Sequence, residues 1–225
     1  MLLLAIAIAA PVTLAQDLAP DAMLRAITVE VIDQVRRDHE RQAAEPAKIA
    51  ALVETRILPL FDFAHMTRLA VAHSWHVATT EQQKRLTKEF KTLLVRTYST
   101  ALSNYRDEVI DVKHLRPAPV GSSATVRSEV KRPGNERMTL DYVMEKTPAG
   151  WRIYDVKVAG VCLVANYRDV FAEKVRDGGV DGLIQFLVDE NAGGSSRFNS
   201  VRTSFWEKSR VMYAILQNIF RSSRQ

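Results

Sequence analysis

Apolar residues in the first half of the chain recur three and four positions apart, which is the spacing of one face of an α-helix. This pattern predicts an amphipathic helix over residues 21–43 and a shorter helix from Pro46 to Leu58. Pro59 fits the end of the second helix, because proline has no N–H to continue the hydrogen-bond ladder. Residues 61–76 form a third helical stretch. The apolar positions of the first helix are Leu24, Ile27, Val31 and Val35.

The longest helical pattern covers residues 79–105 and begins with a capping box, which we assign to Thr80 and Gln83. In such a box each side chain satisfies a free backbone N–H of the first turn. The apolar positions keep helical spacing along the whole segment. They are Leu86, Phe90, Leu93, Leu94, Tyr98, Leu102 and Tyr105.

The period changes from 3.6 to 2 after Arg106, which predicts β-strands. Four alternating or β-branched segments follow, separated by short connections that contain Gly or Pro. Two closing helices are predicted over 166–176 and 180–190, divided by Gly178, Gly179 and Gly182. The sequence therefore predicts an α+β fold in which helices cover an antiparallel sheet of about four strands. The strand segments are 107–115, 122–131, 137–146 and 151–164.

Residues 1–15, MLLLAIAIAAPVTLA, contain no charged residue and match the length of a signal-peptide core. Small residues at Thr13 and Ala15 place the cleavage site after Ala15, although no Lys or Arg precedes the apolar run. A buried N-terminal helix is the alternative. No later segment has a charge-free run long enough to cross a bilayer, so we expect an exported, soluble protein. We also expect it to be a monomer. A single cysteine, Cys162, excludes an intramolecular disulfide.

The sequence offers few groups for catalysis. His65, His73 and His76 are close in sequence, but no acidic residue or cysteine accompanies them at ligand spacing, so we read them as helix-surface histidines rather than a metal site. Cys162 lies in an apolar strand without an adjacent base and is expected to act as a small buried hydrophobic residue. Asp155 is an acid inside an apolar strand. It could serve as a general base in a cavity, or be paired with an Arg or a backbone amide.

Apolar side chains are in surplus on the long helix and on the strand that holds Met138, Leu140, Tyr142 and Met144. A filled core would absorb them all. A cavity between the sheet and the helices, lined by adaptable Met and Tyr side chains, would use them equally well. Periodicity alone does not separate these two interpretations.

Two stretches of the chain resemble the MlaC family of periplasmic phospholipid carriers, also called toluene-tolerance proteins. The first, residues 60–94, has F-D-F at 61–63 and a Trp followed by TTEQQ at 79–83. The second, residues 150–187, has G-W-x-x-Y-D-V at 150–156 followed by G-V and N-Y-R. The resemblance extends over about 25–190. Ala159 stands where the family usually has Glu, and Cys162 stands where Ser is common.

The resemblance implies an NTF2-like fold that holds phospholipid acyl chains between sheet and helices, without catalysis or a cofactor. It also implies a periplasmic location and two partners, an outer-membrane lipoprotein–porin complex and an inner-membrane ABC transporter complex with an MCE-domain protein. Lipid carried between them would maintain outer-membrane lipid asymmetry. The alternatives are an NTF2-like isomerase or dehydratase with Asp155 and a histidine in its cavity, and a fully packed adaptor protein.

Combining this implied pocket with the apolar pattern gives a predicted set of lipid-binding residues. On the strands the choice depends on parity, since a shift of one residue reverses the faces. The set is Leu69, Leu94, Tyr98, Leu102, Tyr105, Met138, Leu140, Tyr142, Val156, Val158, Val161, Leu163, Tyr167, Phe171 and Leu183.

The net charge of +5 suggests nucleic-acid binding, but its position in the chain argues against that function. Residues 191–225 contain six basic residues and one acidic residue, so the other 190 residues carry 25 of each sign and sum to zero. We therefore predict three regions: the signal peptide 1–15, a lipid-binding domain 16–190 and a basic amphipathic tail 191–225. The tail suits an anionic membrane surface or a partner; a docking helix or a disordered end fits its sequence as well.

Overall fold

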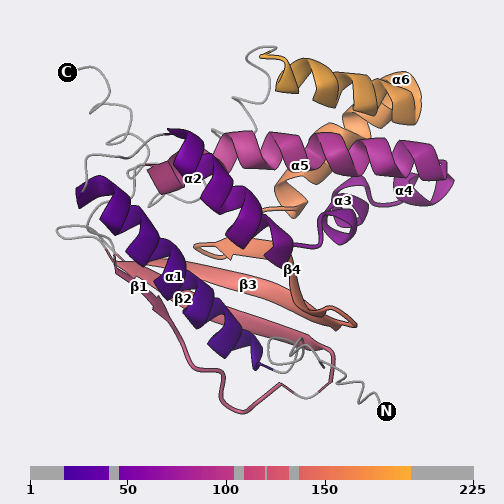
Figure 1. Cartoon of the computed structure of the whole chain (residues 1–225). Helices are drawn as coiled ribbons and strands as arrows, with labels where there is room; N and C mark the ends of the chain where they lie inside the picture. The colour runs from indigo at the N-terminus through magenta and orange to yellow at the C-terminus, as the bar shows by residue number, and fades with distance from the viewer. Residues whose placement is uncertain (1–17, 41–45, 104–108, 120, 132–136, 194–225) are drawn as a thin grey trace, which may run out of the picture.

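The computed structural model describes residues 18–40, 46–103, 109–119, 121–131 and 137–193 (Figure 1). Helices come first, an antiparallel sheet follows and one long helix comes last, which confirms the predicted α+β class. The helical elements are α1 (Pro20–Glu40), α2 (Pro46–Leu52), η1 (Val53–Ile57), η2 (Leu58–Leu60), α3 (Phe63–Val71), α4 (Ser74–Val77), α5 (Thr80–Ser103) and α6 (Ala165–Asn191). The strands are β1 (Val109–Val112), β2 (Ser123–Lys131), β3 (Met138–Thr147), β4 (Gly150–Val158) and β5 (Val161–Cys162).

The second predicted helix is less regular than its sequence pattern indicates. After α2 the chain continues as the π-helical segment η1 and then as the 3₁₀ turn η2. Pro59 lies at the start of η2 and does not end the helical path. Because Pro59 has no N–H to donate, the α-helical hydrogen-bond pattern stops before it and the chain tightens to 3₁₀ geometry.

The long helix α5 is capped one residue earlier than predicted. Thr79 and Gln82, not Thr80 and Gln83, form the reciprocal bonds of the capping box. The Thr79 N–H donates to Gln82 Oε1 at 2.9 Å, and the Gln82 N–H donates to Thr79 Oγ1 at 3.2 Å. Gln83 instead donates its amide to the carbonyl of Trp75 at 2.9 Å. Thr80 is already the first residue of the helix, so its side chain is too far along to cap it.

Glycines divide α6 as predicted. Gly178 and Gly179 have non-helical dihedral angles, and the φ of 67° at Gly179 is in the left-handed region that glycine adopts without a Cβ clash. The two predicted closing helices are therefore the two arms of one kinked element.

The sheet has five strands, in the order β1-β2-β3-β4-β5, with every neighbouring pair antiparallel. The predicted number of about four is too low because the last predicted segment, 151–164, folds back on itself. Ala159 and Gly160 have φ of 49° and 83°, as a two-residue hairpin turn requires, and they separate β4 from β5.

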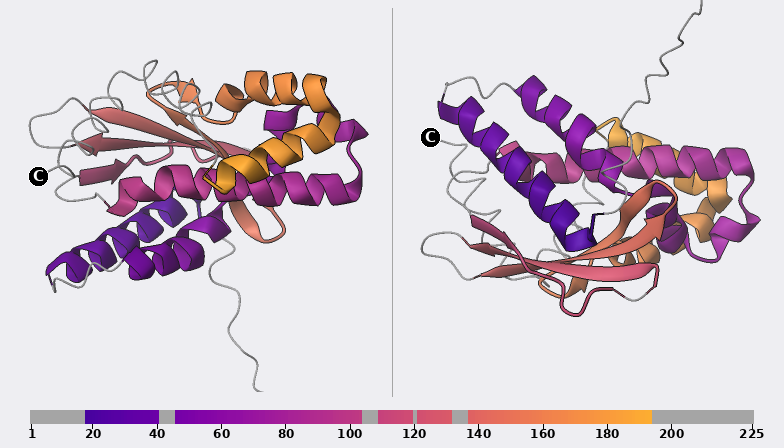
Figure 2. Two further views of the ribbon diagram at one scale, coloured as in Figure 1. Left: turned by 90° about the horizontal axis from the view of Figure 1, so that it is seen from above. Right: turned by 60° about the horizontal axis from the view of Figure 1, so that its bottom comes forward.

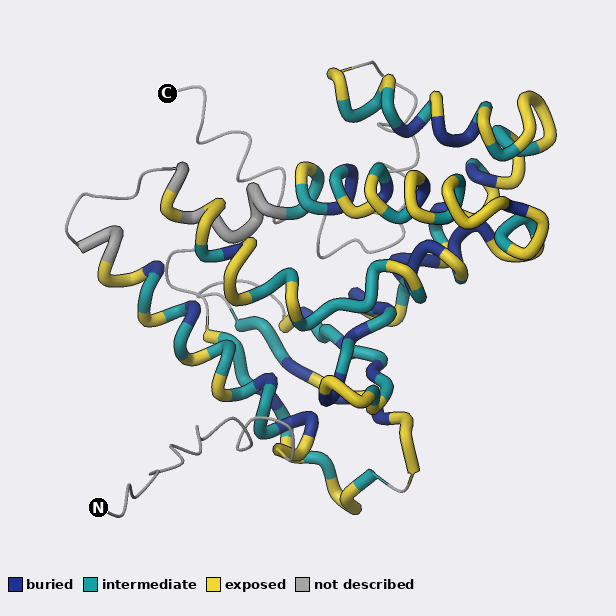
Figure 3. The backbone as a smooth tube through the Cα atoms, turned by 45° about the vertical axis from the view of Figure 1, so that its right-hand side comes forward, coloured by how far each residue is buried: buried dark blue, intermediate teal, exposed yellow. Residues whose placement is uncertain are grey.

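Helices α1, α2 and α5 lie on one side of the sheet (Figures 1 and 2). Buried positions gather where these layers face each other, and exposed positions follow the outer sides of the helices (Figure 3). The main core cluster joins α3, α5, α6 and the β3–β4 end of the sheet, with Phe90, Tyr167 and Phe171 in edge-to-face and tilted ring contacts at its centre. A second cluster packs α1 against β1–β4 around Val126 and Met144.

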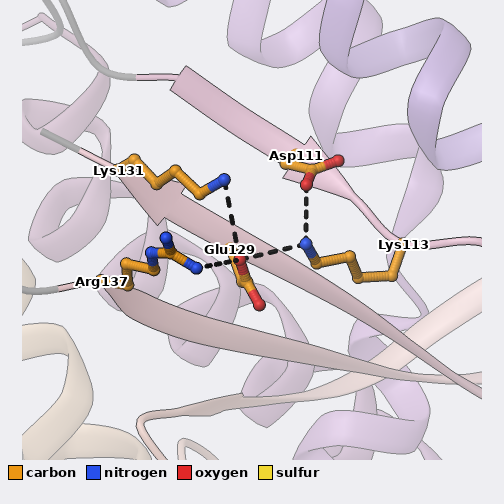
Figure 4. A network of polar contacts seen from close by, with 5 residues as sticks. All are labelled: Asp111, Lys113, Glu129, Lys131 and Arg137. Atoms are coloured by element: carbon orange, nitrogen blue, oxygen red, sulfur yellow. Dashed lines mark hydrogen bonds and ion pairs between the residues drawn. The ribbon is translucent and has the colours of Figure 1, made fainter.

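The opposite face of the sheet carries charged side chains. Arg127 on β2 makes two bonds to Asp141 on β3, at 2.6 and 2.9 Å. Glu129 lies among Lys113, Lys131 and Arg137, and Lys113 also binds Asp111 (Figure 4). The hydrogen bond from Lys113 holds the pKa of Glu129 below its ordinary value. The alternation of this charged face with the apolar face fixes the register of the strands.

None of the helices in the described ranges combines the length and apolar character needed to span a bilayer. The predicted signal peptide, and the tail beyond Gly193, lie outside the described residues.

Candidate functional site

An apolar cavity of about 280 Å³ lies between the helices and the β3–β4 part of the sheet. Its wall is formed by η1 with η2, the start of α3 with Phe61 before it, residues 94–98 of α5, strands β3 and β4, and Leu163 directly after β5. All fourteen lining side chains are aliphatic, aromatic or Met. They are Val53, Ile57, Leu58, Phe61, Phe63, Met66, Leu94, Val95, Tyr98, Leu140, Tyr142, Val156, Val158 and Leu163.

Strand alternation places the sheet side of this wall. On β3, Leu140 and Tyr142 point to the cavity, and on β4 Val156 and Val158 do the same. The register pairs Leu140 with Val158 and Tyr142 with Val156, so the four side chains form one contiguous patch. The parity used for the predicted set is therefore the parity of the structure.

Three of the helical lining residues come from an unusual piece of backbone. The π-helical η1 and the 3₁₀ turn η2 direct Val53, Ile57 and Leu58 to the cavity. A π-helical turn changes the direction of side chains relative to a regular α-helix. The predicted set does not contain these residues, because the sequence pattern predicts a plain helix from Pro46 to Leu58 and does not show the π-helical turn.

The predicted set divides into three groups. Seven members line the cavity: Leu94, Tyr98, Leu140, Tyr142, Val156, Val158 and Leu163. Six lie in or against the main core cluster beside it: Leu69, Met138, Val161, Tyr167, Phe171 and Leu183. The Leu102 side chain and the whole of Tyr105 lie outside the described residues. Seven lining residues were missed: Val53, Ile57, Leu58, Phe61, Phe63, Met66 and Val95.

The F-D-F motif at 61–63, with the helix that follows it, positions three lining residues that the predicted set does not contain. Phe61 pairs with Ile153 through an isolated parallel bridge, and Asp62 accepts the N–H of His65 at 2.8 Å to cap α3. These contacts fix the backbone so that Phe61 and Phe63 both face the cavity, with Met66 one turn later on α3. Phe61 and Phe63 also stack, with ring centroids 5.7 Å apart.

The polar side-chain atoms on the lining are the hydroxyls of Tyr98 and Tyr142. Tyr98 Oη lies 3.3 Å from Tyr167 Oη. Burial raises the pKa of Tyr142 above its ordinary value of 10.0, which keeps this phenol neutral at physiological pH. The described wall contains no carboxylate, imidazole or thiol, so it presents a neutral, apolar surface to a ligand.

Asp155 does not face the cavity. Its Oδ1 accepts the N–H groups of Val156 at 2.9 Å and Val164 at 3.1 Å, and its Oδ2 accepts the thiol of Cys162 at 2.6 Å. The interpretation of Asp155 as an acid paired with backbone amides is confirmed. The expectation that Cys162 is a small buried hydrophobic residue is wrong: it is only partly buried, and the tight turn at Ala159 and Gly160 brings its thiol to Asp155.

His65 also differs from its predicted place on the helix surface. Its side chain is 14% exposed, and Nδ1 lies 2.7 Å from Glu145 Oε1. The imidazole stacks on the ring of Tyr154, with centroids 4.3 Å apart and planes 11° apart. His73 and His76 are exposed, as predicted.

Comparison with known proteins connects this architecture to lipid binding in relatives. The chain is 24% identical over 164 residues to the toluene tolerance protein ttg2D of Pseudomonas putida, covering 72% of this chain and 75% of that protein. It is 17% identical over 171 residues to the intermembrane phospholipid transport system binding protein MlaC of Haemophilus influenzae, covering 75% and 80%.

A solved structure extends the similarity to the fold. The phospholipid-binding protein from Ralstonia solanacearum, determined in complex with a phospholipid, superimposes with a TM-score of 0.70 at 35% identity. The match covers 80% of this chain and all of that one. The MlaC protein family model matches residues 25–189, which include every described lining residue of the cavity. The chain therefore belongs to the MlaC family.

Proposed function

We propose that this protein binds phospholipid in the apolar cavity and carries it through the periplasm between the outer and inner membranes. The observation that carries the proposal is the uncharged, predominantly apolar described lining of a cavity between sheet and helices, in a chain whose structural neighbour was determined with a bound phospholipid.

The free energy of hydration explains why such a carrier is needed. Burying one methylene group is worth about 0.8 kcal/mol, so two acyl chains with about 30 methylenes would cost on the order of 24 kcal/mol to expose to water. A lipid crosses an aqueous compartment at a useful rate when a protein keeps its chains out of water. Such transfer makes and breaks no covalent bond, and the described lining residues offer no carboxylate, imidazole or thiol for catalysis.

The cavity is small for a phospholipid. About 280 Å³ is at the lower end of the roughly 300–1,000 Å³ range of ligand cavities. A phospholipid with two chains therefore requires the wall to move outward. In η1 and η2 the chain leaves regular α-helical geometry, and we propose that this part of the wall moves.

Family membership is the support for the partners that we propose. Transfer between membranes requires an acceptor on each side, and we propose the outer-membrane lipoprotein–porin complex and the inner-membrane MCE-domain transporter complex. The protein would act as a periplasmic monomer with no catalytic role and no cofactor.

Mass spectrometry of an organic extract of the purified native protein tests the proposal. A phospholipid near one per chain supports it, and an extract without lipid would contradict it. A lipid-free protein with a packed interior would favour an adaptor. Recovery of a small polar ligand would favour an enzyme. Transfer of labelled phospholipid between separated donor and acceptor vesicles then tests carriage as distinct from binding.

A further inference from the structure

Three side chains with metal-ligating groups meet where α3 begins beside the end of β3. They are Asp62, His65 and Glu145, all half-buried, and their donor atoms lie within 4.8 Å of one another. None of the three lines the cavity. Glu145 is 80 residues from His65 in the sequence, so the cluster exists only in the folded chain.

The fold holds these donors in place through contacts outside the cluster. The Asp62 N–H donates to the carbonyl of Ile153 at 2.8 Å, which ties the start of α3 to β4. The His65 ring is fixed by its stack on Tyr154. Glu145 is held by strand pairing between β3 and β4, opposite Arg152. Ligands positioned in this way lose little conformational entropy when they bind an ion.

The charges of the cluster are unbalanced. The cluster holds two carboxylates and one imidazole, and among the described residues no Lys or Arg side chain lies within 4.0 Å of either carboxylate. Arg152, the cross-strand neighbour of Glu145, donates its guanidinium to the carbonyl of Trp151 at 2.9 Å instead. The capping bond uses Asp62 Oδ1, and Oδ2 makes no hydrogen bond to another described residue.

We propose that Asp62, His65 and Glu145 form a binding site for a divalent cation of the zinc class. One imidazole nitrogen and two carboxylate oxygens are a donor set that Zn²⁺ accepts at about 2.0–2.2 Å, with water completing the coordination. His65 Nδ1 faces Glu145 Oε1 at 2.7 Å, so small side-chain movements place an ion between them. Binding replaces the hydrogen bond of this pair with two metal–ligand bonds.

The three proposed ligands come from two elements that border opposite sides of the cavity. Phe63 and Met66 on α3 line the cavity, whereas Glu145 belongs to the sheet. A bound ion therefore joins the helical wall of the cavity to its sheet wall. Because the ion binds the folded chain and not the separated ligands, it stabilises the fold by mass action.

The test is calorimetric titration of the EDTA-treated full chain with Zn²⁺ alone, without added lipid. We expect one saturable site per chain in the wild type. Glu145→Gln, which keeps shape and removes charge, is expected to weaken binding at least tenfold. Asp62→Asn is expected to do the same, since asparagine caps a helix as well as aspartate does. His76→Ala, on the exposed helix α4, is the matched control and should bind as the wild type.

Thermal unfolding supplies a second readout. Zn²⁺ should raise the melting temperature of the wild type and of His76→Ala, and leave that of Glu145→Gln unchanged. Absence of saturable binding in the wild type, or wild-type affinity in both Glu145→Gln and Asp62→Asn, would overturn the proposal. Loss of binding in His76→Ala with retention in Glu145→Gln would also overturn it, because the ion would then belong to α4.

Discussion

The thiol of Cys162 donates a hydrogen bond to the buried carboxylate of Asp155, with Sγ 2.6 Å from Oδ2. Asp155 is 6% exposed and also accepts two backbone N–H groups, so it joins β4, β5 and the start of α6 at one point. Buried carboxylates are tolerated when hydrogen bonds replace their hydration. The thiol is thus one of three donors that compensate the burial of this charge.

Replacement of Cys162 separates the effect of the hydrogen bond from that of packing. Cys162→Ser keeps a donor, and a hydroxyl is a stronger one than a thiol, so we expect the free energy of unfolding to stay equal or rise. Cys162→Ala removes the donor and should cost about 1–3 kcal/mol, the penalty for an under-satisfied buried group. Urea denaturation of both variants measures this. Equal destabilisation by Ser and Ala would mean that packing of the sulfur, not its hydrogen bond, is what matters.

The same pair predicts a pH dependence. Burial, and then the bond to Asp155, raise the pKa of Cys162 from 9.0 to about 11. A raised pKa in the folded state means that the stabilising contribution is complete below pH 9 and is lost as pH rises from 9 to 11. Below pH 9 the free energies of unfolding of the wild type and of Cys162→Ser should differ by a constant amount. Above pH 9 the wild type should lose stability relative to the Ser variant. A thiol reagent at pH 8 should react slowly with the native protein and rapidly in urea.

The displaced capping box gives a local test of the structure. Thr79→Ala removes the oxygen that accepts the Gln82 N–H, so we expect a loss of about 1 kcal/mol in unfolding free energy. Thr80→Ala is the matched control, because Thr80 is inside the helix and alanine has a higher helix propensity than threonine. A larger loss of unfolding free energy in Thr80→Ala than in Thr79→Ala would support a capping box formed by Thr80 and Gln83 instead.

Filling the cavity should displace lipid without unfolding the protein. Val95 lies on α5 with its side chain half-buried at the cavity wall, so Val95→Trp places apolar volume where an acyl chain would lie. We expect phospholipid recovered per chain to fall several-fold while thermal stability is kept. Val77→Trp, at a position 69% exposed on α4, is the matched control and should carry lipid as the wild type. Undiminished lipid in a folded Val95→Trp variant would show that the cargo lies elsewhere.

Sequence patterns predict which side of each strand faces the helices better than they predict which residues line the cavity. Alternation was enough to place Leu140 and Val156 on the cavity side, because a strand has two faces and the charged one is solvated. It did not separate these residues from Met138 on the same face, which packs into the core. Whether apolar side chains fill the space between the helices and the sheet depends on how these two layers pack. The π-helical turn of η1 directs Val53 and Ile57 to the cavity, and the sequence pattern does not predict that turn. The bond of His65 to Glu145 joins residues far apart in the sequence, so no local pattern predicts it. The bond of Cys162 to Asp155 depends on the tight turn between β4 and β5.

The position of the net charge in the chain gives a test of the tail beyond the described residues. All of the +5 charge lies in residues 191–225, and we propose that this segment contacts anionic membrane surfaces. Truncation should follow Gly193, because the end of α6 is fixed through Asn191, whose amide donates to the Glu89 carbonyl at 3.0 Å, and through Arg96, which donates to the Glu190 carbonyl at 2.8 Å.

The truncated chain should fold and load lipid as the full chain does, since every described lining residue of the cavity precedes the cut. Its affinity for vesicles containing anionic phospholipid should fall, because each basic residue near such a surface contributes about 1 kcal/mol. Sedimentation with anionic and with neutral vesicles, at low and at physiological salt, measures the difference. A full chain that binds anionic vesicles no better than the truncated one would assign the tail to a protein partner instead of the membrane, since charge attraction to lipid would then contribute nothing measurable.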